Sequence, residues 1–265
     1  REDRARLLYA PSVQFIRYDE NDRKIRKQVW DDYSLNPQQL IESIWNDLPE
    51  WREGDEIRDG LYRKIVPHYS EAVIRELIAN ALVHRPYTTR GDIFINLHPT
   101  YLEIHNPGLL PLGVTPRNIL HASVKRNIHL AKVFYDLNLM EQEGSGYDRI
   151  YEDLLLSAKP PPIVEEGADR VTVKVESRIL KTQTLRFMEQ VNDRYELKQR
   201  ELIALGLLAQ HESLSSLEFT RLLELEDRSE RLREWIGRLM DWGLVTATGR
   251  TRARTYRVTP NVLDK

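Results

Sequence analysis

The chain of 265 residues has no cysteine and no long apolar run. The first absence excludes disulfide scaffolds, thiolate zinc sites and cysteine nucleophiles, and it suits a reducing compartment. The longest apolar run, 202–209, has about 8 residues, whereas a membrane-spanning helix needs about 20. No signal-peptide pattern opens the chain and it begins with Arg1. We therefore expect a cytoplasmic protein with no membrane partner, whose own N-terminus lies upstream.

Neither sign of charge predominates, with 39 Lys+Arg against 41 Asp+Glu and a formal net charge of −2. This balance excludes a protein coated with nucleic-acid-binding charge but leaves local patches open. Three motifs are also missing from the sequence: G-x-x-x-x-G-K-[ST], H-E-x-x-H and G-x-S-x-G. A P-loop nucleotide site, an H-E-x-x-H zinc protease and a G-x-S-x-G hydrolase are therefore excluded.

Periodicity before residue 180 predicts strands, a helix, a hairpin, further helices and a closing strand. Asn36 and Ser70 are the expected N-caps of two helices, and the second helix ends before Pro86. Residues 51–60 are a polar stretch. The predicted strands are 13–18, 26–30, 92–97, 101–105 and 170–175, and the other predicted helices are 115–120, 128–137 and 146–156. This order predicts an α+β domain.

Residues 182–265 have a different pattern. Helices are predicted over 184–195 and 197–210, then after the N-caps Ser215 and Ser229, and a hairpin follows over 244–258. Three helices and a hairpin are the order of a winged helix. We expect three parts: 1–60, the tail of a preceding segment with connecting elements; 61–181, a nucleotide-binding domain; and 182–265, a winged helix-turn-helix domain.

The most informative polar pattern lies on the helix that follows Ser70. Glu76, Asn80 and His84 are spaced at i, i+4 and i+8, so they share one face of a helix whose other side is apolar. A carboxylate can orient or deprotonate a water, and an amide oxygen can ligate a hard cation such as Mg²⁺. Taken alone, the same spacing also suits a solvated helix face.

Two glycine-containing loops flank a basic run. Gly108 lies in the first loop, and the second, with Gly144 and Gly146, precedes a predicted helix, where backbone N–H groups can approach a phosphate. Between the loops, Lys125 and Arg126 are placed to close over a polyphosphate. For each loop considered singly, simple turn chemistry is the favoured explanation.

The runs 69–85, 102–108, 125–127 and 143–146, in this order, resemble the RecG-like C-terminal ATPase-type domain. That family is a divergent branch of the gyrase, heat-shock chaperone, histidine-kinase and MutL (GHKL) superfamily with the Bergerat nucleotide-binding fold. The domain usually follows an AlbA-like domain of the Schlafen type and often precedes a winged helix. The resemblance spans roughly residues 10–180 and implies a Bergerat-type α/β sandwich, with helices on one face of a mixed sheet, followed by a winged helix.

The resemblance also implies roles for individual residues. Glu76 would be the general base, Asn80 the ligand of Mg²⁺, and Asn106 the residue that recognises adenine. Gly108 would belong to the first glycine box, and Gly144 and Gly146 to the second. The expected cofactors are ATP or ADP with Mg²⁺, and the expected nucleotide-binding residues are Asn80, His84, Asn106, Gly108, Lys125, Arg126, Gly144 and Gly146.

The sequence departs from the superfamily at Asn106, where an aspartate is usual. A carboxylate only accepts hydrogen bonds, whereas an amide both accepts and donates, so adenine selectivity is weakened. The loop after Pro107 also lacks a second glycine at short spacing. We therefore expect nucleotide binding with at most slow hydrolysis. No helicase motor motif is present.

Arginines gather in two places near the C-terminus. Within the predicted winged helix, the hairpin arginines share parity and hence one face, and another group begins the helix after Ser229. Such residues would contact the phosphates and base edges of duplex DNA. The alternative is a module for protein contacts, whose arginines are solvated or paired with Glu230 and Glu234. The candidate DNA-binding residues are Arg228, Arg231, Arg233, Arg250, Arg252 and Arg254.

Three functions follow from these patterns. The first is a dimeric DNA-binding regulator in which a Bergerat-type domain senses nucleotide for a winged helix. The second is an ATPase subunit of a nucleic-acid-processing or anti-phage defence system, with its effector upstream. The third keeps the fold as an inactive scaffold for protein assembly. Nucleotide binding and turnover distinguish the three.

Overall fold

The structure is a computed structural model that describes residues 12–32, 34–59, 62–140, 146–225, 231–250 and 254–260. The chain forms two compact units. Unit 1 comprises 1–116, 123–146 and 162–178, and unit 2 comprises 117–122, 147–161 and 179–265. Over the described ranges, no helix has the length and apolar character needed to cross a membrane.

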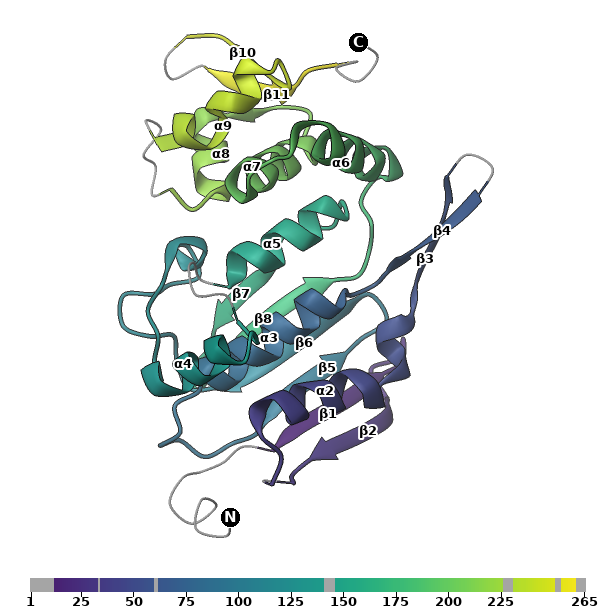
Figure 1. Cartoon of the computed structure of the whole chain (residues 1–265), viewed down its shortest axis with the longest axis vertical. Helices are drawn as coiled ribbons and strands as arrows, with labels where there is room; N and C mark the ends of the chain where they lie inside the picture. The colour runs from purple at the N-terminus through teal and green to yellow at the C-terminus, as the bar shows by residue number, and fades with distance from the viewer. Residues whose placement is uncertain are drawn as a thin grey trace. The chain divides into compact units, whose positions relative to one another are not determined.

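Unit 1 is built on a six-stranded sheet in the order β2-β1-β5-β6-β8-β7 (Figure 1). β1 and β5 run parallel, and the other neighbouring strands run antiparallel. The strands are β1 (Val13–Tyr18), β2 (Lys24–Trp30), β5 (Ile93–Leu97), β6 (Tyr101–Pro107), β7 (Ile163–Glu166) and β8 (Arg170–Glu176). This mixed sheet with helices confirms the predicted α+β class.

Two capped helices lie side by side over one face of this sheet (Figure 1). α2 (Pro37–Asp47) begins at Asn36, whose side chain accepts from the Gln39 N–H while Gln39 accepts in return, forming a capping box. α3 (Glu71–His84) begins after Ser70, which accepts from the third residue of the helix. Both caps confirm the sequence prediction. The strand side chains that face the helices form the core, with exposures of at most 3% for Val13, Phe15, Ile93, Ile95 and Ile104.

The polar stretch after α2 holds an unpredicted hairpin. A 3-10 turn, η1 (Pro49–Arg52), leads into β3 (Gly54–Asp59), which pairs antiparallel with β4 (Tyr62–Pro67) as a separate two-stranded sheet. The Glu56 carboxylate accepts two hydrogen bonds of 3.0 Å from Arg63 across the pair. The alternation that predicts strands is masked here because both faces carry charged side chains.

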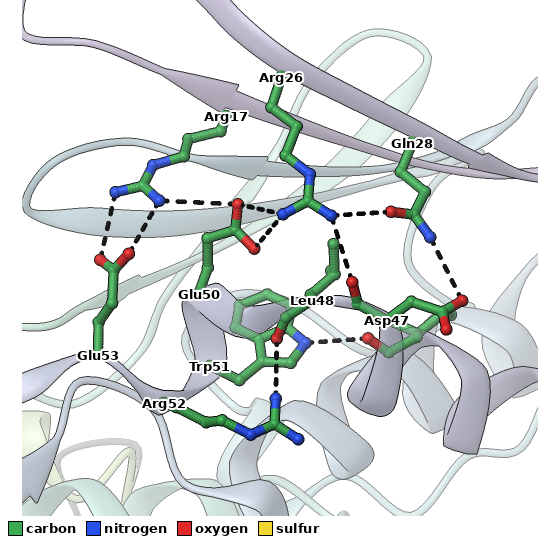
Figure 2. A network of polar contacts seen from close by, with 10 residues as sticks. Arg17, Arg26, Gln28, Asp47, Leu48, Glu50, Trp51, Arg52 and Glu53 are labelled. Carbon is green, nitrogen blue, oxygen red and sulfur yellow. Dashed lines mark hydrogen bonds and ion pairs between the residues drawn. The ribbon is translucent and has the colours of Figure 1, made fainter.

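A network of charges ties β1 and β2 to η1 (Figure 2). Glu50 is only 4% exposed, and its two carboxylate oxygens accept from Arg26 at 2.8 and 2.9 Å. Arg17 lies 3.6 Å from the same carboxylate and pairs with Glu53 at 2.8 Å. A buried carboxylate is tolerated only when it is compensated in this way.

Unit 2 is mainly helical, with a small antiparallel sheet in the order β10-β11-β9. α7 is its centre: Leu205 and Leu208 are fully buried, and Gly206 lets α5 approach so closely that a Cβ there would lie 2.7 Å from Leu155 Cβ. Its elements are η2 (Ile119–His121), α5 (Tyr147–Leu156), α6 (Thr182–Tyr195), α7 (Gln199–Ala209), β9 (Leu214–Ser215), α8 (Ser216–Leu222), α9 (Leu232–Asp241), β10 (Val245–Thr248) and β11 (Thr255–Val258).

Most predicted helix ends agree with the structure, and one predicted helix is wrong. Ser215 caps α8, as predicted, and Glu218 completes a capping box with it. Gly243, the predicted stop, follows the end of α9 by two residues and has a φ of +71°. The predicted helix over 115–120 is a series of turns that ends in η2, because six residues after a Gly/Pro loop are too few for stable i→i+4 bonding. The predicted N-cap Ser229 lies outside the described residues.

Candidate functional site

The buried polar face of α3 forms the centre of the candidate site. Glu76 and Asn80 are 4% and 6% exposed. The Asn80 amide nitrogen donates to Glu76 O at 2.9 Å and to Glu76 Oε1 at 3.0 Å. Because both acceptors are oxygens that cannot donate, the amide orientation is set, and Asn80 Oδ1 points elsewhere. Among the described residues, none hydrogen-bonds to this buried oxygen.

Gly146 lies directly against this pair. Its φ of +72° is in the left-handed region, and a Cβ at this position would collide with Glu76 Oε1 and lie 3.0 Å from Asn80 Nδ2. Only glycine fits both the backbone conformation and the close approach. The structure thus brings together Glu76, Asn80 and Gly146, as predicted from residues far apart in the sequence. The predicted partner Gly144 lies outside the described residues.

Asn106, at the end of β6, reaches the same helix. Its amide nitrogen donates to Ala81 O at 3.0 Å. Because a carbonyl oxygen can only accept, the atom facing Ala81 O is the nitrogen, and Asn106 Oδ1 is buried without a hydrogen-bond partner in the described part of the chain. One N–H of the amide is therefore used inside the fold, and this hydrogen bond fixes Oδ1 as the acceptor atom of the side chain.

Gly108 makes the turn after β6. Its φ is +92°, a Cβ there would collide with Pro86 just beyond α3, and its N–H donates to Asp169 O at 2.8 Å. The glycine therefore allows the loop to pass close to the end of α3. An open hollow of about 540 Å³ adjoins it, lined by Pro86, Thr88, Thr89, residues 108–112 and Arg126.

The basic run 125–127 is fixed to both neighbours. Arg126 donates to Leu109 O, which joins it to the loop after Gly108. Asn127 donates 2.7 Å hydrogen bonds to the carbonyls of Val83 and Arg85 and so caps the C-terminal end of α3. No role for Asn127 was predicted from the sequence, where it was one residue of the run 125–127.

The two cations affect His84, the last residue of α3. Burial, together with the nearby charges of Arg126 and Lys125, lowers the pKa of His84 to about 4. The imidazole is therefore neutral at pH 7. The Lys125 ammonium lies 4.4 Å from the centroid of the Tyr135 ring on α4 (Ile128–Asp136), a cation–π contact.

These groups fit Mg²⁺ and an amino-bearing base. A hard cation prefers oxygen ligands, and Asn80 Oδ1 is a buried amide oxygen with no other partner among the described residues. Asn106 Oδ1 is the acceptor that an exocyclic amino group requires. Lys125 and Arg126 supply the positive charge that phosphates require.

In unit 2, the predicted DNA-binding arginines lie at two places. Arg231 and the exposed Arg233 begin α9, whereas the exposed Arg250 and the half-buried Arg254 flank the hairpin tip between β10 and β11. Because β10 ends at residue 248 and β11 begins at residue 255, Arg250 and Arg254 are not on a strand, and strand alternation does not place them on one face as predicted. Arg228 and Arg252 lie outside the described residues.

Comparison with known proteins supports part of this assignment. Residues 91–175 match the family model described as "Putative ATP-dependent DNA helicase recG C-terminal". This stretch is similar to a RecG C-terminal ATPase-type domain. It contains Asn106, Gly108, Lys125, Arg126 and Gly146, whereas the Glu76 and Asn80 helix lies before it. The match supports an ATP-binding domain of the ATPase type, and it covers neither the predicted AlbA-like tail nor the predicted winged helix.

A solved structure has the same fold. The crystal structure of the DIP2311 protein from Corynebacterium diphtheriae superposes with a TM-score of 0.79 at 20% sequence identity, over 97% of this chain and 54% of that chain. The present chain therefore spans about half the length of that protein, and at this identity the likeness concerns the fold. No curated protein matches the sequence.

Proposed function

We propose that unit 1 binds ATP or ADP with Mg²⁺ at the α3 face and that this binding regulates a DNA-binding function of unit 2. The observation that carries the nucleotide proposal is the pair of buried oxygens, Asn80 Oδ1 and Asn106 Oδ1, that lack hydrogen-bond partners in the described residues. A buried polar atom without a partner in the fold calls for a water, an ion or a ligand, and these two oxygens lie on or against the polar face of α3. Asn80 would hold Mg²⁺ and Asn106 would accept from the adenine amino group.

Glu76 has the position expected of a general base. Mg²⁺ would supply charge stabilisation at the phosphates, and Glu76, held by Asn80, would orient or deprotonate a water. The carboxylate is buried and already accepts a hydrogen bond from Asn80, which favours a fixed orientation. We propose that turnover is slow and that nucleotide binding is the main activity.

Calorimetry with Mg-ADP tests the site. Asn80→Ala removes the metal ligand and should weaken Mg-ADP binding by about tenfold or more, equivalent to about 1.4 kcal/mol. Glu76→Gln keeps the hydrogen bond to Asn80 possible, so it should retain binding and abolish phosphate release from ATP. Asn96→Ala, which removes another buried asparagine of unit 1 outside the site, is the matched control. Equal affinity of the parent chain and Asn80→Ala would show that the site is assigned wrongly.

Turnover by the parent chain separates the two active alternatives. Slow hydrolysis that depends on Glu76 agrees with a nucleotide-sensing regulator. Fast hydrolysis would favour the second candidate, an ATPase subunit of a nucleic-acid-processing or defence system. Absence of nucleotide binding would leave the inactive scaffold.

The DNA proposal rests on the order of elements in unit 2. Helices α7, α8 and α9 are followed by the hairpin β10–β11, to which β9 adds a third strand, and this is the arrangement expected of a winged helix. Arg231 and Arg233 lie where a recognition helix begins, and Arg250 and Arg254 lie beside the hairpin tip. We propose duplex DNA as the partner and a homodimer as the binding form, because two half-sites suit a symmetric dimer.

Salt dependence tests the arginines of the hairpin. Replacing Arg250, Arg252 and Arg254 together by Ala should weaken binding to any duplex and reduce the slope of log affinity against log salt by roughly two to three, at about 0.9 for each lost phosphate contact. Arg257→Ala, an exposed change on β11, is the matched control. A folded triple variant with unchanged affinity and slope would transfer unit 2 to the class of protein-interaction modules.

A further inference from the structure

The loop between Gly108 and Asn127 belongs to both units. Its ends carry the candidate nucleotide-binding residues Gly108, Lys125 and Arg126 and are part of unit 1, whereas its middle, 117–122, is part of unit 2. Within unit 2, Ile119 and Leu120 are 5% and 2% exposed. The middle of the loop is therefore built into the core of the unit that contains α8 and α9.

Glu224 fixes this segment from the end of α8. Its Oε2 accepts from the Leu120 N–H at 2.7 Å, and its Oε1 accepts from the Tyr151 hydroxyl of α5 at 3.2 Å. Each carboxylate oxygen thus has a donor from a different element of unit 2. The backbone of Glu224 has a φ of +54°, the left-handed conformation in which glycine usually ends a helix. A glutamate in this strained conformation is compensated by the two hydrogen bonds that its side chain accepts.

His121 makes a second attachment to the same helices. Its Nε2 lies 2.7 Å from Leu223 O, and since a carbonyl only accepts, this nitrogen carries the proton and donates. The imidazole also meets the ring of Trp235 on α9 edge-on, with centroids 5.6 Å apart and planes at 90°. Leu223 and Trp235 are 0% and 3% exposed, so both attachments enter the core of unit 2.

We propose that Glu224 and His121 couple nucleotide occupancy in unit 1 to the C-terminal helices α8 and α9, with Glu224 as a positioning residue. This inference rests on the nucleotide binding proposed above. A nucleotide bound by Lys125 and Arg126 adds a restraint to the ends of the loop. The restraint reaches α8 and α9 because the middle of the loop is hydrogen-bonded to Leu223 and Glu224, which follow α8. Coupling of this kind is reciprocal, so a ligand of unit 2 changes nucleotide affinity by the same factor.

Hydrogen exchange in the full chain, with and without saturating Mg-ADP, tests the coupling. In the parent chain, Mg-ADP should slow exchange of the Leu120 amide and of amides 223–225 and 232–241 by about tenfold, within the usual range of coupling energies. Glu224→Ala should bind Mg-ADP with an affinity within about threefold of the parent and lose the slowing in 223–225 and 232–241. Glu212→Ala, an exposed glutamate of the same unit, should behave as the parent chain.

The possible outcomes separate the two proposals. A parent chain that binds no Mg-ADP refutes the nucleotide function and the coupling together. A parent chain that binds Mg-ADP with no change of exchange in unit 2 refutes the coupling alone, as does Glu224→Ala with an undiminished response. If Glu224→Ala fails to fold by circular dichroism, Glu224→Gln carries the test: it keeps one acceptor oxygen for two donors, so an intermediate response supports the coupling and a full response refutes it.

Discussion

Replacing the adenine amino group by a carbonyl oxygen probes the role of Asn106 directly. One N–H of its amide donates to Ala81 O at 3.0 Å, which orients the side chain, and its buried Oδ1 is an acceptor without a partner in the described residues. The exocyclic amino group of ADP can donate to Oδ1. IDP has a carbonyl oxygen in place of that amino group, and two acceptors cannot form a hydrogen bond with each other. The lost hydrogen bond and the buried unpaired oxygen together cost about 1.5–3 kcal/mol, so IDP should bind roughly 10–150-fold more weakly than ADP.

Calorimetry with the two nucleotides at the same Mg²⁺ concentration measures this ratio. Asn106→Leu removes the acceptor and should bring the two affinities to within about threefold of each other. The helix end tolerates this change, because Ala81 O still accepts from the Arg85 N–H at 3.2 Å. Asn96→Leu, on β5, should leave the ratio unchanged. Equal affinity of the parent chain for ADP and IDP would refute the assignment of Asn106 as an acceptor that recognises the base.

Two further predictions concern stability. Gly146→Ala should lower the free energy of unfolding by about 1–3 kcal/mol in denaturant titrations, because residue 146 has a left-handed backbone and its new Cβ would collide with Glu76 Oε1. The control is Gly237→Ala, in a helix with open space around it, which should be neutral or stabilising. Burial raises the pKa of Glu224 to about 7, so the folded state holds this proton more tightly than the unfolded chain. The free energy of unfolding should therefore fall as pH rises from about 4.5 to about 7, by about 1–2 kcal/mol for this half-buried group. Glu224→Gln should lack that part of the fall. Identical pH dependence of stability in the parent chain and the variant would contradict the raised pKa of Glu224.

Local signals predicted most of the elements of unit 1. Asn36 and Ser70 cap their helices as expected because an N-cap needs only a side-chain oxygen and the next three residues. The hairpin β3–β4 was not predicted, since its pairing depends on cross-strand contacts such as Glu56 with Arg63 and not on an apolar face. Periodicity detects burial, and this hairpin buries little.

The sequence predicted which residues form the candidate site, but not the hydrogen bonds that orient them. The spacing of Glu76 and Asn80 indicated a shared face, and the structure adds that one side chain orients the other. Asn106 looked like a departure that weakens base selection, yet its hydrogen bond to Ala81 O fixes the orientation of the amide and the position of its acceptor oxygen. That contact joins residues 25 positions apart, so no local pattern reveals it. Glu224 was missed for the same reason, because its donors lie 104 and 73 positions away in the sequence.

The interleaving of the two units has a consequence for synthesis on the ribosome. All of unit 1 has been made once residue 178 is added, but 117–122 and 147–161 belong to unit 2, whose remaining residues, 179–265, come last. α5 is therefore synthesised before α7, its packing partner. Until α7 is made, the side chains of Ile150, Leu154 and Leu155, which are 0–1% exposed in the folded chain, are not buried against it. The exposed apolar face of an amphipathic helix that is translated before its partner is prone to aggregation. The nascent chain thus passes through a stage at which all residues of unit 1 have been synthesised while segment 147–161 of unit 2 still lacks the rest of its core.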